Sequence, residues 1–303
     1  MDSRSIAVGC SSGNPIFAPL RTAQKTGSGM RIDVDARRWQ WLPDLREMIA
    51  YRDLFLVLAY RDLQVRYAQT VLGIVWALVQ PMATLLVMTL VFGRAVGVDT
   101  DGLPYPLFAI TGISAWTYFA FVMKESGGSL IASQEMVRKI YFPRLLVPMS
   151  KSAVGLTDLL VALLVMVALF FYYGIAPQER IILAALYLIG IVISALGVGI
   201  WISALTIRYR DLQHVVPFAI QIGLFITPVA YTARTVTERL PEWLQAIYFL
   251  NPMAGLIEGY RWCLIGVGDP GGWCWLSFAS SLVLLLTSFI YFRSMERVVA
   301  DLI

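Results

Sequence analysis

The sequence predicts an all-α integral membrane protein with six transmembrane helices per chain, and three observations lead to this prediction. Hydrophobic residues make up 58% of the 303 residues and charged residues only 15%, against about 45–50% and about 25% in soluble domains. The mean hydropathy is +0.69. Six apolar runs are candidate spans, because about 20 residues cross roughly 30 Å of hydrocarbon. These runs are residues 72–92, 105–123, 153–173, 181–207, 215–231 and 272–292. The fifth run is short and contains Pro217 and Pro228, so its ends are uncertain.

The distribution of basic residues predicts the orientation of these spans. If both termini are cytoplasmic, 19 of the 24 lysines and arginines fall in segments on the cytoplasmic side and five on the other side. Cytoplasmic loops of membrane proteins carry such an excess of basic residues. We therefore expect both termini in the cytoplasm. In a membrane protein the net charge of +4 says little about nucleic acid, and we expect no nucleic-acid partner.

Two segments precede the predicted six-span domain, which covers residues 72–303. Residues 1–30 are rich in Gly, Ser, Thr and Pro and contain no apolar run of signal-peptide length, which predicts a disordered cytoplasmic tail. Residues 31–71 form the predicted interface region. Within it, residues 42–67 mix apolar residues with four arginines, the pattern of an amphipathic helix in the cytoplasmic interface with arginines toward lipid phosphates.

The longest predicted cytoplasmic loop between spans is 124–152. Residues 129–139 read as a short helix, and Pro143 and Pro148 end helical structure after it. A short, ordered, charged loop is suited to contact a cytoplasmic partner, and an ordinary connection between helices is the alternative. We therefore treat 124–152 as a candidate coupling loop.

The predicted external segment 232–271 has too many apolar residues for a plain loop. Residues 241–248 and 253–264 show helical spacing and are separated by Asn251-Pro252. Neither is long enough to span a bilayer, so two short helices that dip into the outer leaflet are expected. They form a predicted external gate between spans five and six.

The sequence lacks the residues of several kinds of catalytic or metal site. No lysine follows a glycine, so the chain has no phosphate-binding loop of the Walker type. A single histidine, His214, makes a histidine-based metal site improbable, and Cys263 and Cys274 give no basis for a disulfide. Asp158 is the one ionisable residue within the predicted spans, and we expect it to anchor the span by reaching Lys151 or interfacial water.

Two polar stripes lie on predicted spans. At 100° per residue, Trp76, Gln80 and Thr84 share one face of the first span, and a second set of three shares one face of the fifth. Amides facing lipid are costly, so both faces should meet protein or a lumen. Helix packing is one explanation, and a passage for glycan lined by rings and amides is the other. The second set is Phe218, Gln221 and Phe225, and Trp116 and Phe119 of the second span either add to such a passage or belong to an interfacial belt.

Several motifs, in order along residues 42–300, resemble the permease subunits of ABC exporters for bacterial surface polysaccharides such as O-antigen, capsule and teichoic acid. Each motif alone is weak, whereas the ordered set is specific to that family. The motifs are YRDLQVRY at 60–67, QTVLGIVWALVQP at 69–81, VRKIYFPR at 137–144, RYRDLQ at 208–213, ITPVAY at 226–231 and NPM at 251–253.

The resemblance implies a non-enzymatic subunit of the bacterial inner membrane. It implies a homodimer of permeases that binds two cytoplasmic ATPase subunits, with ATP and Mg on those partners and no cofactor on this chain. The implied substrate is a lipid-linked glycan that moves from the inner leaflet outward, and membrane lipids surround the permease. The ATPase contacts would be Arg61, Ser129, Gln134, Glu135, Arg138 and Lys139, and the external gate would include Trp243, Tyr248, Asn251 and Pro252.

Two alternatives remain open at the level of sequence. A permease of an ABC exporter for a drug or lipid would share the fold and differ only in the family motifs. A multispanning lipid-linked sugar transferase should show clustered acids or histidines at the membrane surface, and the acids of this chain are scattered.

Overall fold

The computed structural model describes residues 20–26, 29–35, 45–67, 75–268 and 270–302. The chain divides into two compact units, Met1–Trp41 and Leu42–Ile303. Each unit is considered by itself.

The first unit contains a β-hairpin. Strand β1 (Leu20–Thr26) pairs antiparallel with β2 (Gly29–Asp35), so that Leu20 lies opposite Asp35 and Thr26 opposite Gly29. The prediction of a disordered tail over 1–30 is therefore wrong for residues 20–26 and 29–30, and residues 1–19 lie outside the described part. The physical reason is visible in the sequence, because Met30, Ile32 and Val34 alternate with charged residues at the period of two typical of a strand.

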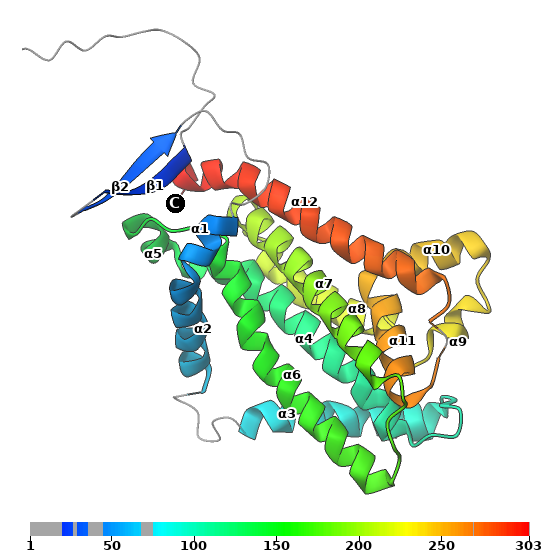
Figure 1. Cartoon of the computed structure of the whole chain (residues 1–303). Coiled ribbons are helices and arrows are strands. Elements are labelled where there is room, and N and C mark those ends of the chain that lie inside the picture. Colours follow the sequence, from blue (N-terminus) through cyan, green and yellow to red (C-terminus); the bar gives the residue numbers. More distant parts are fainter. Residues whose placement is uncertain (1–19, 27–28, 36–44, 68–74, 269, 303) are drawn as a thin grey trace, which may run out of the picture. The chain divides into compact units, whose positions relative to one another are not determined.

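Every described element of the second unit is a helix, which confirms the all-α prediction for that unit (Figure 1). Gly97, with φ 70°, ends the helical segment Thr89–Val96, since glycine adopts the left-handed conformation without strain. The elements are α1 (Leu45–Ala50), α2 (Arg52–Tyr67), α3 (Val75–Met88) with its π-helical continuation η1 (Thr89–Val96), α4 (Tyr105–Ala132), α5 (Gln134–Lys139), α6 (Leu146–Tyr173), α7 (Ile181–Arg208), α8 (Leu212–Ile226), α9 (Ala233–Thr237), α10 (Glu242–Leu250), α11 (Pro252–Ile265) and α12 (Trp273–Leu302).

Five helical segments in the described part are long and apolar enough to cross a membrane. The fifth predicted span, 215–231, is shorter than expected, because α8 has 15 residues and ends at Ile226. Pro228 lacks a backbone N–H and disfavours helix at the residue before it, which stops α8 there. The five segments are Val75–Val96, Tyr105–Ala132, Leu146–Tyr173, Ile181–Arg208 and Trp273–Met295.

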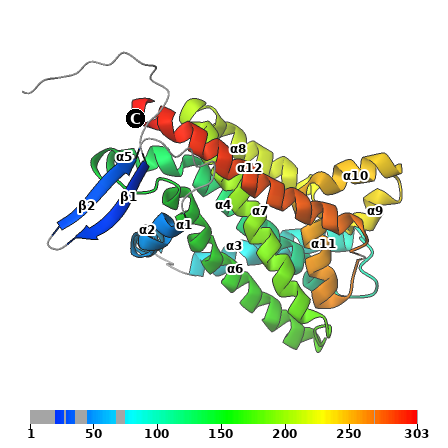
Figure 2. The same cartoon turned by 45° about the horizontal axis from the view of Figure 1, so that its top comes forward.

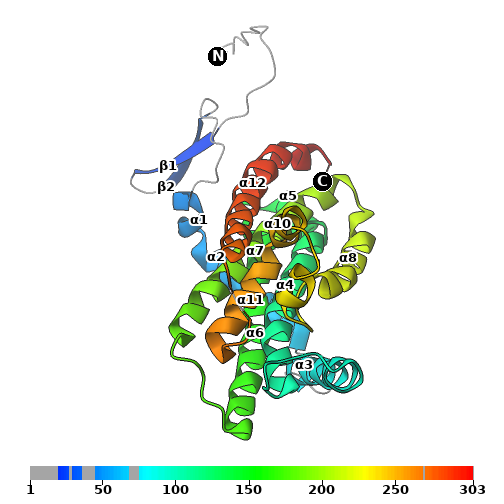
Figure 3. The same ribbon diagram turned by 90° about the vertical axis from the view of Figure 1, so that its right-hand side faces the viewer.

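Helix α4 is the centre of the second unit. It packs against α3, α6, α7, α8 and α11, and the view along the bundle shows it among them (Figure 3). Helix α12 runs along α7 (Figures 1 and 2). Their backbones approach so closely that a Cβ on Gly197 would lie 2.9 Å from the backbone nitrogen of Leu285. Such close approach is typical of helices packed within membranes.

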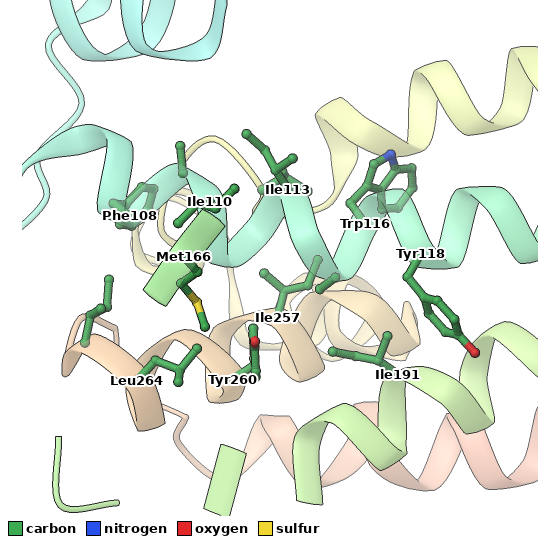
Figure 4. Packing of buried hydrophobic residues seen from close by; sticks show 14 of the residues in the cluster. Phe108, Ile110, Ile113, Trp116, Tyr118, Met166, Ile191, Ile257, Tyr260 and Leu264 are labelled. Carbon is green, nitrogen blue, oxygen red and sulfur yellow. The ribbon is translucent and has the colours of Figure 1, made fainter. Parts of the chain in front are cut away.

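Helix α11 is surrounded by other helices of the second unit. Twelve of its 14 residues are buried, and Figure 4 shows Ile257, Tyr260 and Leu264 directed toward α4. The expectation that 253–264 is a helix is confirmed. Helices α4, α7 and α12 pack against α11, and its place in the outer leaflet stays a prediction.

Candidate functional site

A cavity of about 660 Å³ opens between five helices of the second unit. Its lining comes from the end of α2 and from α3, α4, α6 and α8. The predicted passage residues Gln80, Thr84 and Trp116 all lie on its wall. Sequence reasoning placed these three residues on two spans, and the structure brings them to one site.

Most of the cavity wall away from α2 is uncharged. Gln80, Pro81 and Thr84 of α3 belong to this part of the wall, and so do Ile220 and Leu224 of α8. The hydroxyl of Thr84 donates to the backbone carbonyl of Gln80 at 3.0 Å. Rings, amides and hydroxyls without fixed charge suit a ligand that has apolar C–H faces and many hydroxyl groups.

Two ion pairs join α2 to α6 at the other side of the cavity. Lys151 Nζ lies 2.7 Å from Asp62 Oδ2, and Arg66 Nη2 lies 2.7 Å from Asp158 Oδ2. The hydroxyl of Tyr67 donates to Asp158 Oδ1 at 2.9 Å. The four charged side chains are 12–28% exposed. We name these contacts the α2–α6 ion pairs.

These contacts correct two expectations. Asp158 pairs with Arg66 rather than with Lys151, since Asp62 already occupies Lys151. Arg66 is turned into the protein rather than toward lipid phosphates, and its guanidinium lies 4.5 Å from the Phe121 ring centroid. These partners could not be predicted from the sequence, because Asp62 and Lys151 are 89 residues apart.

Tyr67 remains a neutral hydrogen-bond donor at physiological pH. Burial, followed by the nearby Asp158 carboxylate, raises the pKa of Tyr67 to about 12. The hydrogen bond to Asp158 is therefore available over the whole physiological range.

The remaining predicted passage residues lie away from the cavity. Trp76 is 51% exposed, and Phe218 and Phe225 are each 62% exposed. Gln221 shares their exposed face of α8, a helix of which only Val216 is buried. Phe218, Gln221 and Phe225 thus share one exposed face of α8, and no residue in the described part of the chain covers it.

Phe119 is the predicted lining residue that the structure places in the core. It is 7% exposed, and its ring centroid lies 5.5 Å from that of Trp116. Figure 4 shows Trp116 and Tyr118 leaving α4 on opposite sides, with Trp116 toward α8. Phe119 thus packs against the Trp116 ring and does not line the cavity.

The predicted coupling helix 129–139 is divided between two helices. Ser129 belongs to α4, is 2% exposed, and donates its hydroxyl to the carbonyl of Ser126 at 2.7 Å, so it offers no contact surface. Helix α4 ends at Ala132, and after Ser133 the six-residue α5 begins at Gln134. The other predicted contact residues, Arg61, Gln134, Glu135, Arg138 and Lys139, are exposed.

The predicted gate residues fall on α10 and α11. Trp243 is 65% exposed, whereas Tyr248 is half-buried. Asn251 caps α11, because its Oδ1 accepts from the backbone N–H of Met253 at 3.1 Å, and Pro252 occupies the first helical position. The amide of Asn251 also donates to Thr227 Oγ1 at 3.0 Å, which ties α11 to the end of α8.

A second charged network, which was not predicted from the sequence, lies within α11. Arg261 is 0% and Glu258 1% exposed, and Arg261 Nη1 lies 3.2 Å from Glu258 Oε2. A signal was present, because the two charges stand three residues apart in an otherwise apolar helix and so share one face. Cys263 and Cys274 are both buried.

Comparison with known proteins identifies the family of this chain. The sequence profile of the family described as ABC-2 type transporter matches residues 53–265, which include the whole cavity and α11. The chain belongs to the ABC-2 type transporter family. It is therefore a membrane-embedded, multi-pass transporter subunit, as the motifs predicted.

Several curated relatives carry the names of export or transport proteins. The chain is 31% identical over 210 residues, 69% of its length, to 79% of an O-antigen export system permease protein RfbA of Klebsiella pneumoniae. It is 27% identical to a protein of the same name from Myxococcus xanthus, over 72% of this chain and 82% of that one. The polysialic acid transport protein KpsM of Escherichia coli is 22% identical over 65% of this chain and 76% of its own length.

Proposed function

We propose that this chain is the permease of an ATP-driven exporter that moves a lipid-linked polysaccharide, of the O-antigen kind, from the cytoplasmic side across the bacterial inner membrane. The observation that carries the proposal is the similarity to O-antigen export permeases over about four-fifths of their length. The matched region contains every predicted passage residue. The uncharged, amide- and ring-bearing wall of the cavity suits a glycan.

The proposed topology has six spans, with α8 as the fifth. At 1.5 Å per residue α8 is about 22 Å long, so it needs the buried segment after Ile226 to complete a crossing of roughly 30 Å. Both termini, α2 and α5 lie on the cytoplasmic side in this topology, and α9 and α10 lie outside. The excess of basic residues at the end with α2 and α5 supports this orientation.

The proposed assembly is a homodimer of permeases with two ATPase subunits. An exposed amide such as Gln221 is unfavourable against lipid, so the exposed α8 face needs either a second permease or a passage beside it. A second copy that presents the same face supplies both. Trp76 on α3 would then border that passage.

The ATPase contact is proposed at α5. Its four polar residues are exposed, while Val137 between them is buried and fixes the helix to the bundle. Tyr141, just beyond α5, donates to Glu47 of α1 at 3.4 Å. Work delivered to α5 therefore has a path toward α1 and α2, and from α2 through the α2–α6 ion pairs to the cavity wall.

The test compares two lining variants with two matched controls. In W76A and F225A, surface glycan per assembled permease–ATPase complex should fall several-fold, because stacking on aromatic rings is lost. The controls W275A and F171A remove rings that are 67% and 83% exposed on α12 and α6. They should leave export per complex unchanged. A loss of export that merely parallels a loss of assembled complex would contradict the lining role.

An ABC exporter for another amphiphile remains the second candidate. The charged side of the cavity, with three acidic and three basic side chains, would suit the polar headgroup of such an amphiphile as well as that of a lipid-linked glycan. Export of a lipid without glycan by the purified complex, at the rate of a lipid-linked glycan, would establish it.

A further inference from the structure

The segment after α8 is buried although it is irregular. Residues 227–230 are all buried, and no helix includes them before α9 begins at Ala233. Non-helical backbone at this depth of a membrane protein is tolerated only where protein groups satisfy its polar atoms. The partners of these carbonyl groups therefore decide how α8 ends.

Arg261 supplies most of those partners. Its Nη2 donates to the carbonyls of Pro228 and Val229 at 2.9 and 3.0 Å, and its Nη1 donates to the carbonyl of Tyr231 at 3.2 Å. Nη1 also donates to Glu258, and Nε donates to Thr111 Oγ1 at 3.3 Å. A guanidinium has five N–H donors, and all five are used here.

Neighbouring side chains complete the network. The carbonyl of Ala230 accepts from the Tyr105 hydroxyl at 3.0 Å, so four consecutive carbonyls are satisfied by side chains of α4 and α11. Glu258 Oε2 accepts from the backbone N–H of Ala233 at 3.3 Å. The guanidinium lies 3.9 Å from the ring centroid of Phe108. We name Arg261, Glu258 and the backbone of 228–231 the Arg261 network.

The packing around this network leaves no room for adjustment. A Cβ on Gly112 of α4 would lie 2.6 Å from the carbonyl oxygen of Val229 and 2.9 Å from Arg261 Nη2. Real Cβ atoms do not approach so closely. Gly112 is thus required by the close approach of α4 to this segment.

Along α8 only Val216 is buried, and the helix packs on one side only, through Ile220, Gly223 and Leu224, while its other face is exposed. Its direction therefore depends on how its ends are held as well as on this one-sided packing. We propose that Arg261 is a positioning residue, which holds the end of α8 at Ile226 against α4 and α11 and so fixes the face that carries Phe218, Gln221 and Phe225. The effect on export rests on the proposed function, whereas the effect on α8 does not.

Hydrogen exchange of the purified permease–ATPase complex, measured without substrate, tests the claim. Lysine offers three donors in place of five, so in R261K at most three of the five hydrogen bonds can be remade. Exchange of the amides of 229–233 should then be about tenfold faster or more. The amides at the start of α8 should exchange as in the wild type. Export per complex should fall with the loosening of 229–233.

Two further variants keep the test informative if R261K assembles poorly. G112A leaves Arg261 intact but forces Val229 away, and it should produce the same local loosening. G128A, on the same helix, is the matched control, since the nearest atom to its Cβ would be 3.9 Å away. It should change nothing.

Unchanged exchange over 229–233 in both R261K and G112A would overturn the proposal, and so would equally faster exchange along the whole chain. Faster exchange over 229–233 with normal export per complex would overturn the positioning role. If the wild-type complex exported no glycan, the proposed function would fail, while the exchange result would still decide whether Arg261 holds α8.

Discussion

The α2–α6 ion pairs and the Arg261 network use the same chemistry, a carboxylate beside a cation, in different surroundings. Side chains of the α2–α6 ion pairs are 12–28% exposed and line a cavity. Arg261 and Glu258 are 0% and 1% exposed and lie in the packed interior. Water can replace a partner in the former and has no access to the latter. The comparison indicates that the α2–α6 ion pairs can rearrange, whereas the Arg261 network is fixed.

Removal of the Arg261 side-chain charge should have the largest effect on stability. R261M leaves Glu258 buried without its cation and three carbonyls without donors, so the free energy of unfolding should fall by about 3–5 kcal/mol. Thermal unfolding of the assembled complex measures this change. R239M, at an exposed arginine between α9 and α10, serves as control and should fall within about 0.5 kcal/mol of the wild type.

Neutralisation of Asp158 should cost less. D158N loses the charge opposite Arg66 but keeps an oxygen that can accept from Tyr67, and the site is partly hydrated, so a loss of about 1–2 kcal/mol is expected. The same unfolding assay applies. A loss as large as that of R261M would show that water does not reach the α2–α6 ion pairs and would remove the distinction between the two networks.

A double exchange of partners sharpens the comparison further. D62K and K151D should each destabilise α2 against α6, and the combined variant should recover about 1 kcal/mol through the restored pair. High salt should reduce that recovery, because the pair is partly screened. Recovery that is independent of salt would contradict a hydrated contact.

Charge reversal on α5 should have the smallest effect on stability. Glu135 and Lys139 pair at 3.1 Å, but their side chains are 84% and 74% exposed, so E135K should change the unfolding free energy by less than about 0.5 kcal/mol. If α5 receives work from the ATPase, the same variant should still lower the export achieved per ATP hydrolysed. Normal coupling in E135K, with no crosslinks from α5 to the ATPase, would remove α5 from the coupling path.

The sequence predicted the elements whose signal is local. Apolar runs predicted the helices that became α4, α6, α7 and α12, and Asn251-Pro252 predicted the start of α11 because the cap acts within two residues. Proline after Thr227 marked an uncertain end for the fifth span, and α8 does end there.

Features set by distant partners were not predictable from the same reasoning. Helical spacing showed that 253–264 is a helix but not that other helices surround it. Arg261 finds its acceptors 30–33 residues away in the chain, and Asp158 finds Tyr67 at a separation of 91. Trp76 and Gln80 share a helix face, yet only Gln80 reaches the cavity, because that depends on where α4 and α8 lie.

The central claim, ATP-driven movement of a lipid-linked glycan by this permease, is tested most directly in proteoliposomes. The permease is reconstituted with its ATPase and a fluorescent lipid-linked glycan, and a glycosidase on the side opposite the ATPase reports glycan that has crossed. We expect digestible glycan to accumulate only with ATP and a hydrolysis-competent ATPase, and several-fold more slowly with F225A than with F171A. Accumulation that is independent of ATP, or equal movement of the lipid without its glycan, would contradict the claim.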